Sequence, residues 1–256
     1  MKNLYDCHVH LNMKQFSAFR DSLIEECGRI LDFCINVGYD ETSSEESLLL
    51  AYKHPFIKAA VGLHPSYASL GDQRFLDRLS GMLAEEEAAA LGEIGLDYYW
   101  MKDPPDVQKK VFTEQMEIAA HHKKAVIIHD RESHDDTVEI LKAFNGRVRG
   151  VLHSFSGDRT MARAVMDMGY YLSISGPVTF QNKKNIPFRE VVASLPADRL
   201  LIETDSPYLA PVPFRGKTNT PLNVSYVAEE VSSLIKMDLD KFLEISRSGA
   251  RDLFGI

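Results

Sequence analysis

The sequence predicts an α/β protein, a single (β/α)8 barrel of the TIM type. Eight short apolar segments rich in Val, Ile and Leu recur along the 256 residues, and stretches with helical periodicity separate them. Strands buried on both faces of a parallel sheet have this composition. Ionisable residues stand late in these segments, and barrels of this kind carry their active sites at that end. An open doubly wound sheet is the alternative, but no GxGxxG or GxxxxGKS/T loop supports it.

The predicted strands follow one another at short intervals along the whole chain. They are residues 4–10, 33–38, 57–64, 88–97, 125–130, 150–155, 170–175 and 200–205. No low-complexity run or Gly/Ser linker divides the sequence. A barrel of this type commonly has about 250 residues, so we expect one domain over residues 1–256.

Helices are predicted between the strands. Apolar residues recur at helical spacing over Phe16–Phe33, and Pro104 and Pro105 open a helical stretch that continues to Lys123. The C-terminal part predicts two further helices, over Val224–Ile235 and Phe242–Phe254. Asp238 or Asp240 is the expected cap of the last one.

Composition and charge exclude several classes of protein. Hydrophobic residues make up 45% and charged residues 26%, which is typical of a globular protein and excludes disorder. Three cysteines without CxxC spacing predict neither a disulfide framework nor a thiolate zinc site. No apolar run is long enough to span a membrane and no secretory signal is recognisable, so we expect a cytosolic protein. The net charge of −8 argues against broad coating of DNA but allows contact in a local cleft.

The first strand carries an unusual pair of histidines. His8 and His10 are two residues apart, so on a strand their side chains point to the same side. Two histidines satisfied by hydrogen bonds would be the plain explanation. On an otherwise buried strand we favour metal ligation, because neutral imidazole is a common ligand of borderline divalent metals.

Other strands repeat this pattern near the same end. His64 ends the third strand, Glu93 lies late in the fourth, His129 ends the fifth, His153 lies in the sixth, and Glu203 and Asp205 share one face of the eighth. Burying so many ionisable groups together without compensation would be very costly, and cations provide that compensation. The donors exceed what one tetrahedral site needs and suit two divalent ions that share a carboxylate.

At this point the sequence resembles a known family, the TatD-related metal-dependent deoxyribonucleases and hydrolases, a branch of the amidohydrolase-like barrels. The resemblance runs nearly end to end and is carried by six motifs. They are DCHVHLN (6–12), GLHP (62–65), GEIGLDYYW (92–100), IHDR (128–131), HSFSG (153–157) and ETDSPYLAP (203–211). The clearest departure from the family pattern is GKTNTP (216–221), in which Thr218 stands where the family more often has a basic residue. We expect this difference to affect substrate binding rather than metal binding.

The resemblance implies a role for each candidate residue. His8, His10 and Asp205 would hold one metal, His129 and His153 the other, and Glu93 would bridge them. Asp205 would orient or deprotonate the attacking water, so Asp205 and Glu93 are the implied catalytic residues. His64 and Glu203 would touch the ligands or the substrate, with a purely structural role as the alternative for His64.

The chemistry of such a site follows from general principles. A divalent metal lowers the pKa of bound water towards neutrality, and a second ion can neutralise a phosphoryl oxygen. Mixed nitrogen and oxygen ligands suit Zn, Mn, Ni or Co, while Mg prefers oxygen, although the family resemblance allows it. The sequence does not select among these metals.

Several basic and aromatic residues follow the strands and could contact a nucleic acid. They are Arg131, Arg159, Lys183, Lys184, Arg215 and Lys217, with Tyr98, Tyr99, Trp100 and Phe214. Aromatic faces and cations together suit single-stranded nucleic acid. An ordinary mixture of loop residues is the alternative. Arg131, two residues after His129, is the preferred phosphate contact.

We therefore expect a metal-dependent deoxyribonuclease that acts on DNA ends and prefers single strands. Hydrolysis of a small phosphoester, lactone or amide on the same metals is the alternative, because one fold hosts many chemistries. A metal-stabilised binding module is a third, non-catalytic possibility. No membrane or obligate protein partner is expected, and a monomer is the default.

Overall fold

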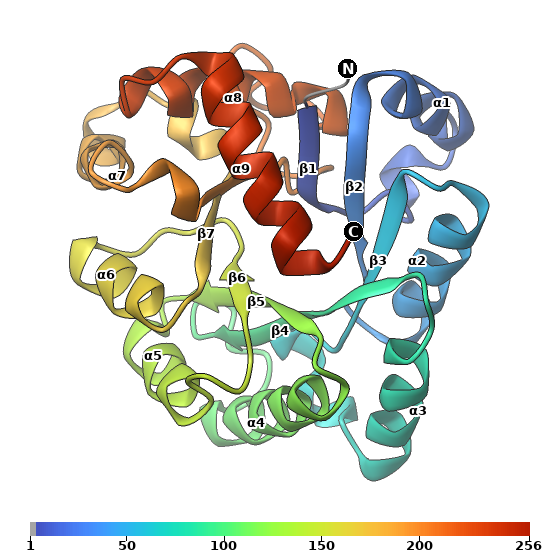
Figure 1. Cartoon of the computed structure of the whole chain (residues 1–256). Helices are drawn as coiled ribbons and strands as arrows, with labels where there is room; N and C mark the ends of the chain where they lie inside the picture. The colour runs from blue at the N-terminus through green and yellow to red at the C-terminus, as the bar shows by residue number, and fades with distance from the viewer. Residues whose placement is uncertain (1–3) are drawn as a thin grey trace.

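Eight parallel strands form the centre of the molecule, which the computed structural model describes over residues 4–256 (Figure 1). In the sheet each strand pairs with the next along the chain, in the order β1 to β8. The strands are β1 (Leu4–Val9), β2 (Leu31–Val37), β3 (Ile57–Val61), β4 (Ala88–Asp97), β5 (Ala125–Arg131), β6 (Gly150–Leu152), β7 (Tyr171–Ile174) and β8 (Leu200–Ile202). All ten residues of β4 are buried, as expected of a strand covered on both faces.

The sheet closes on itself where the end of β1 meets the segment after β8. Val9 forms a parallel bridge with Ser206, and the amide of His10 donates to the Ser206 carbonyl at 2.9 Å. The amide of Asp205 donates to the His8 carbonyl at 2.9 Å. The predicted barrel is therefore confirmed, and the open sheet is wrong.

Every predicted strand is present, but three of them end three residues earlier than expected. β3 ends at Val61 instead of residue 64, β6 at Leu152 instead of 155, and β8 at Ile202 instead of 205. In two cases the chain turns out of the ladder, with Ser154 at φ 42° and Asp205 at φ 54°. His64, His153, Glu203 and Asp205 consequently lie on the segments that follow strands, and Glu203 and Asp205 do not share a strand face.

Helices surround the barrel and alternate with its strands (Figure 1). The α-helices are α1 (Arg20–Ile30), α2 (Glu41–Lys53), α3 (Gln73–Leu83), α4 (Pro105–His122), α5 (His134–Ala143), α6 (Arg159–Asp167), α7 (Ile186–Val192), α8 (Val224–Leu234) and α9 (Leu239–Phe254). The helix expected over 16–33 is shorter, because the 3-10 helix η1 (Lys14–Phe16) precedes α1 and Leu31 already belongs to β2. Asp238 is the cap of α9, since its side chain accepts from the Lys241 amide.

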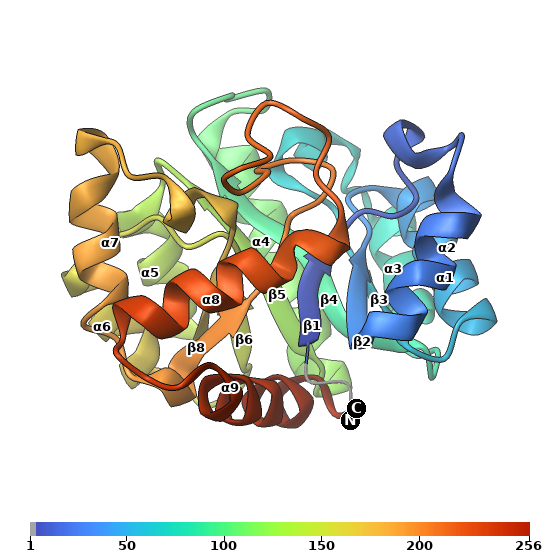
Figure 2. The same cartoon turned by 90° about the horizontal axis from the view of Figure 1, so that it is seen from above.

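The two ends of the barrel differ. Figure 2 shows α9 across one end and the orange loop after β8 rising from the other. The apolar face of α9, which includes Phe242 and Leu253, is buried.

The three free cysteines, Cys7, Cys27 and Cys34, are buried as well. No helix within residues 4–256 is long and apolar enough to cross a membrane.

A buried carboxylate joins the two strands at which the barrel closes. One oxygen of Asp6 accepts from the amides of His8 (3.2 Å) and Thr204 (2.9 Å), and the other accepts from the Thr204 hydroxyl (2.6 Å). Asp6 is fully buried. The carboxylate therefore fixes the backbone beside His8 and beside Asp205.

Replacing Asp6 with alanine is expected to destabilise the barrel. The change leaves buried donors of His8 and Thr204 without an acceptor, at about 1–3 kcal/mol for each. We expect the free energy of unfolding in urea to fall by about 3–5 kcal/mol. Asp167→Ala, at an exposed position of α6, is the control. An equal midpoint of urea unfolding for the two variants would show that the Asp6 hydrogen bonds contribute nothing to stability.

Candidate metal centre

Histidine and carboxylate side chains from five parts of the barrel meet at the C-terminal mouth of the strands. His8 lies on β1 and His10 directly after it, Glu93 on β4, His129 on β5, His153 after β6 and Asp205 after β8. Three overlapping groups, one of which also includes His64, bring metal-ligand atoms within 4.8 Å of one another. The structure thus brings together all six residues expected to be ligands.

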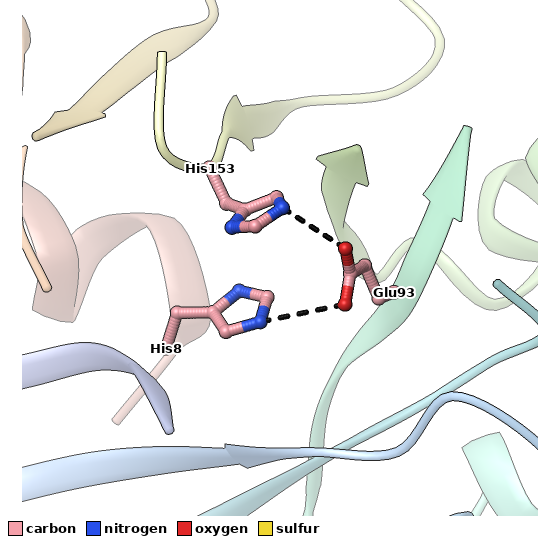
Figure 3. Close-up of side chains that lie close together, drawn as sticks. All are labelled: His8, Glu93 and His153. Carbon is pink, nitrogen blue, oxygen red and sulfur yellow. Dashed lines mark ion pairs between the residues drawn. The ribbon is translucent and has the colours of Figure 1, made fainter. Parts of the chain in front are cut away.

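The Glu93 carboxylate lies between two pairs of histidines. Its Oε1 is 2.7 Å from His129 Nδ1 and 2.9 Å from His153 Nε2. Its Oε2 is 3.5 Å from His8 Nε2 and 3.8 Å from His10 Nε2. Figure 3 shows one oxygen turned to His153 and the other to His8. Each carboxylate oxygen therefore belongs to a different set of nitrogen donors.

Asp205 completes the set that contains His8 and His10. Its Oδ1 lies 3.5 Å from His10 Nε2 and 3.7 Å from His8 Nε2. The two Nε2 atoms are 3.1 Å apart. One set therefore offers two nitrogens and two carboxylate oxygens, and the other offers two nitrogens and one oxygen.

The distances between donors fit cations at this place. Zinc binds imidazole nitrogen at about 2.0–2.1 Å, so two nitrogens on one tetrahedral ion lie roughly 3.3 Å apart. The corresponding distances are 3.1 Å for His8 with His10 and 3.2 Å for His129 with His153. The nitrogens and carboxylates of the cluster fit a metal site, and each set could hold one divalent ion.

Polar contacts behind three histidines leave the inward nitrogen free to bind a cation. His10 Nδ1 lies 2.8 Å from the Val37 carbonyl oxygen and donates to it. His129 Nε2 is 3.2 Å from Asp97 Oδ2, and His153 Nδ1 is 3.3 Å from Glu203 Oε1. A proton held on the outer nitrogen leaves a lone pair on the inner one.

His64 has the opposite arrangement. Its Nδ1 accepts from the Ser66 amide at 3.0 Å, so the proton of the neutral ring is on Nε2. That Nε2 points to the cluster, 3.5 Å from Glu93 Oε1. Burial lowers the pKa of His64 to about 3, which keeps the ring neutral. His64 therefore presents an N–H to the site instead of a lone pair.

Sequence reasoning missed Asp97 and assigned no partner to Glu203. Asp97 is the last residue of β4, buried, and contacts both His129 and the amide of Trp100. Glu203 is fully buried, and its Oε1 accepts from the Ser154 amide at 2.7 Å. Among residues 4–256, its Oε2 has no hydrogen-bond partner. Asp97 is four residues after Glu93 on the same strand, and this spacing could have indicated it.

The histidines and carboxylates of the cluster shift one another's pKa values. Burial by itself would raise the pKa of the Glu93 carboxyl, but His153, His64 and His129 hold it well below its usual range. Burial likewise opposes the low pKa of Asp205, which its hydrogen bond to His10 maintains. The same contacts raise the pKa of His10, His129 and His153 against the effect of burial. In the metal-free protein, protons on these histidines balance the negative charge of the carboxylates.

Metal binding is expected to weaken as the pH falls. Imidazole must be neutral to bind a cation, and the raised pKa of His10, His129 and His153 means that protons begin to compete above about 6.5, the ordinary pKa of histidine. The apparent affinity should fall roughly tenfold per pH unit for every proton displaced. Competition with a chromophoric chelator at pH 8, 7 and 6 measures it. A constant affinity over this range would contradict the coupling.

The basic residues expected around the mouth lie outside the donor cluster. The Arg131 guanidinium lies over the ring of Tyr99, and Arg215 lies 4.5 Å from the centroid of Phe180. Lys217 is 5.9 Å from the centroid of Phe214, and Thr218 is exposed in the same loop. Buried Asn219 anchors this loop by donating to the Thr204 carbonyl at 3.0 Å.

Comparison with known proteins gives consistent matches across the chain. A model of the family described as TatD related DNase matches residues 5–255. An uncharacterized metal-dependent hydrolase of Bacillus subtilis, YabD, is 40% identical over 99% of both chains, and one of Escherichia coli, YcfH, is 34% identical over 99% of this chain and 96% of its own. The crystal structure of YjjV, a TatD homologue from Escherichia coli, superposes with a TM-score of 0.92 at 27% identity, covering 100% of this chain and 99% of the other. A phosphotriesterase homology protein from Escherichia coli, at 12% identity, covers 99% of both chains with a TM-score of 0.69 and shares the fold.

Proposed function

This chain belongs to the family of TatD related DNases and is a metal-dependent hydrolase, and we propose that it is a single-domain deoxyribonuclease that cleaves phosphodiester bonds at the ends of single-stranded DNA. The observation that carries the proposal is the Glu93 carboxylate, which offers one oxygen to each pair of histidines. Two adjacent cations with a shared carboxylate suit a phosphodiester, because the phosphate charge falls on the cations.

We assign His8, His10 and Asp205 to one cation and His129 and His153 to the other, with Glu93 between them. When bound, such ions lower the pKa of water and neutralise charge on the phosphoryl group. Buried Glu203 and Asp97 orient His153 and His129 from behind. Partners of this kind commonly contribute 10- to 100-fold to metal affinity or activity.

Asp205 is the group best placed to receive a proton from the attacking water. Its side chain is 14% exposed, against 6% for Glu93, so solvent reaches it more easily. Contacts with His10, His8 and His153 lower its pKa, so the carboxylate is ionised at neutral pH. His64 Nε2 donates to a phosphoryl oxygen in this proposal, and Arg131 binds the phosphate next to it.

Hydrolysis of end-labelled oligonucleotides tests the proposal. The protein is loaded in turn with Mg²⁺, Mn²⁺, Zn²⁺, Co²⁺ or Ni²⁺, and metal content is verified before the assay. We expect progressive shortening of single strands, slower shortening of duplexes, and none after chelation.

A panel of small phosphodiesters, lactones and amides run in parallel provides the contrast. Activity limited to that panel would overturn the deoxyribonuclease and favour a small-molecule hydrolase. Absence of any turnover with occupied sites would overturn the catalytic proposal as a whole.

A further inference from the structure

Two exposed aromatic rings and one arginine form a compact cluster beside the mouth of the barrel. Tyr99 and Trp100 are 51% and 60% exposed, and their rings meet edge to face with centroids 5.0 Å apart. The Arg131 guanidinium lies 4.0 Å from the Tyr99 centroid and 5.5 Å from that of Trp100. A cation over aromatic rings that remain open to solvent is unlike core packing, where such rings are covered.

This cluster is rigidly joined to the metal centre. Asp97 accepts from the Trp100 amide at 2.8 Å through one oxygen, and its other oxygen is 3.2 Å from His129 Nε2. Arg131 is two residues after His129 and stands opposite Asp97 in the pairing of β4 with β5. The Asp97 carboxylate therefore holds in place both the turn that carries Tyr99 and Trp100 and the His129 ring of the metal centre.

Further aromatic and cationic groups continue along the rim. Tyr39 meets the His10 ring edge to face at 5.8 Å and stacks on Tyr67 at 6.1 Å. Lys102, from the same loop as Trp100, lies 5.6 Å from the Tyr67 centroid. Aromatic faces and cations therefore follow each other from His10 to the loop that carries Trp100.

We propose that Tyr99, Trp100 and Arg131 form a subsite for one nucleotide of single-stranded DNA, with the base on the aromatic rings and its phosphate on the guanidinium. Every base has a flat face that can stack on such rings, whereas in a duplex both faces are already stacked. The subsite would therefore select unpaired ends without selecting sequence. This inference rests on the proposed nuclease function and adds the feature that makes it prefer single strands.

The sequence provides a direct reporter, because Trp100 is the only tryptophan. The probe is a ten-nucleotide oligodeoxythymidylate titrated into the metal-loaded Asp205→Asn protein, with Trp100 fluorescence as the signal. We expect saturable quenching. An abasic oligomer with the same number of phosphates should quench little and bind about tenfold more weakly by competition.

Kinetics on the active protein give a second readout. Tyr99→Ala should raise KM for the single strand about tenfold, with little change in kcat and in the hydrolysis of a small phosphodiester. Arg131→Ala should raise KM for the single strand by a similar factor. Tyr52→Ala is the matched control, because Tyr52 is 78% exposed at the end of α2. Helices of the barrel run opposite to the strands, so this position lies at the far end from the mouth.

The results separate the two proposals. Hydrolysis of single strands with no quenching and an unchanged KM in the variants would overturn the subsite and leave the nuclease intact. Equal binding of the abasic and normal oligomers would also overturn it, since phosphate contacts alone would then explain the affinity. Quenching without hydrolysis in the wild-type protein would support the subsite and overturn the nuclease.

Discussion

Replacing Asp205 with asparagine is expected to leave the barrel folded and reduce turnover by about 10³-fold. The amide keeps the size of the side chain and can still contact His10, but it cannot accept the proton of the attacking water. A well-placed general base contributes roughly 10²–10⁴-fold, and the loss of one carboxylate ligand adds to this. Steady-state hydrolysis of a small phosphodiester and of a labelled single strand measures the effect.

Two measurements make this test specific. Circular dichroism of the metal-free protein should be nearly unchanged, because the Asp205 side chain is 14% exposed and is not part of the apolar core. Asp167→Asn, at an exposed position of α6, should keep full activity. Turnover of Asp205→Asn within threefold of the wild type, at equal metal content, would refute the role assigned to Asp205.

The barrel could be predicted because its strands are locally apolar. Residues 88–97 form a continuous buried strand, and such a segment is recognisable without its neighbours. The contacts that close the barrel have no local sequence signal of this kind. One of these contacts joins Asp6 and Thr204, which are 198 positions apart in the sequence. No local pattern indicates that the Asp6 carboxylate accepts a hydrogen bond from the Thr204 amide.

That these histidines and carboxylates meet at one place could also be predicted, because each stands late in an apolar segment where a charged residue is unexpected. Their geometry could not. Asp205 has φ 54°, and β8 ends at Ile202, so the alternation rule fails there. The proton position of His64 depends on the Ser66 amide, which belongs to the 3-10 helix η2 (Pro65–Leu70). Hydrogen-bond partners of this kind are set by the backbone turn and not by residue type.

Replacing Glu93 with glutamine is expected to have an even larger effect, because it removes the group shared by both donor sets. Glutamine keeps one carbonyl oxygen and turns the other into an amide donor, which repels a cation. We expect metal content to fall below two ions per chain and activity to fall by 10³-fold or more. Bound metal stabilises the fold by about 2.7 kcal/mol at 100 times its Kd, so the variant should also lose most of this gain.

Glu203→Gln is the informative comparison for Glu93→Gln. Glu203 is also buried and contacts His153, but from the side away from the other donors. Its replacement should keep the metal stoichiometry and weaken affinity or activity by about 10- to 100-fold. Metal analysis after gel filtration, with thermal unfolding at several metal concentrations, separates the two cases. If Glu93→Gln retained two ions with wild-type affinity, a bridging role for Glu93 would be untenable, and a site built on histidines and Asp205 alone would replace it.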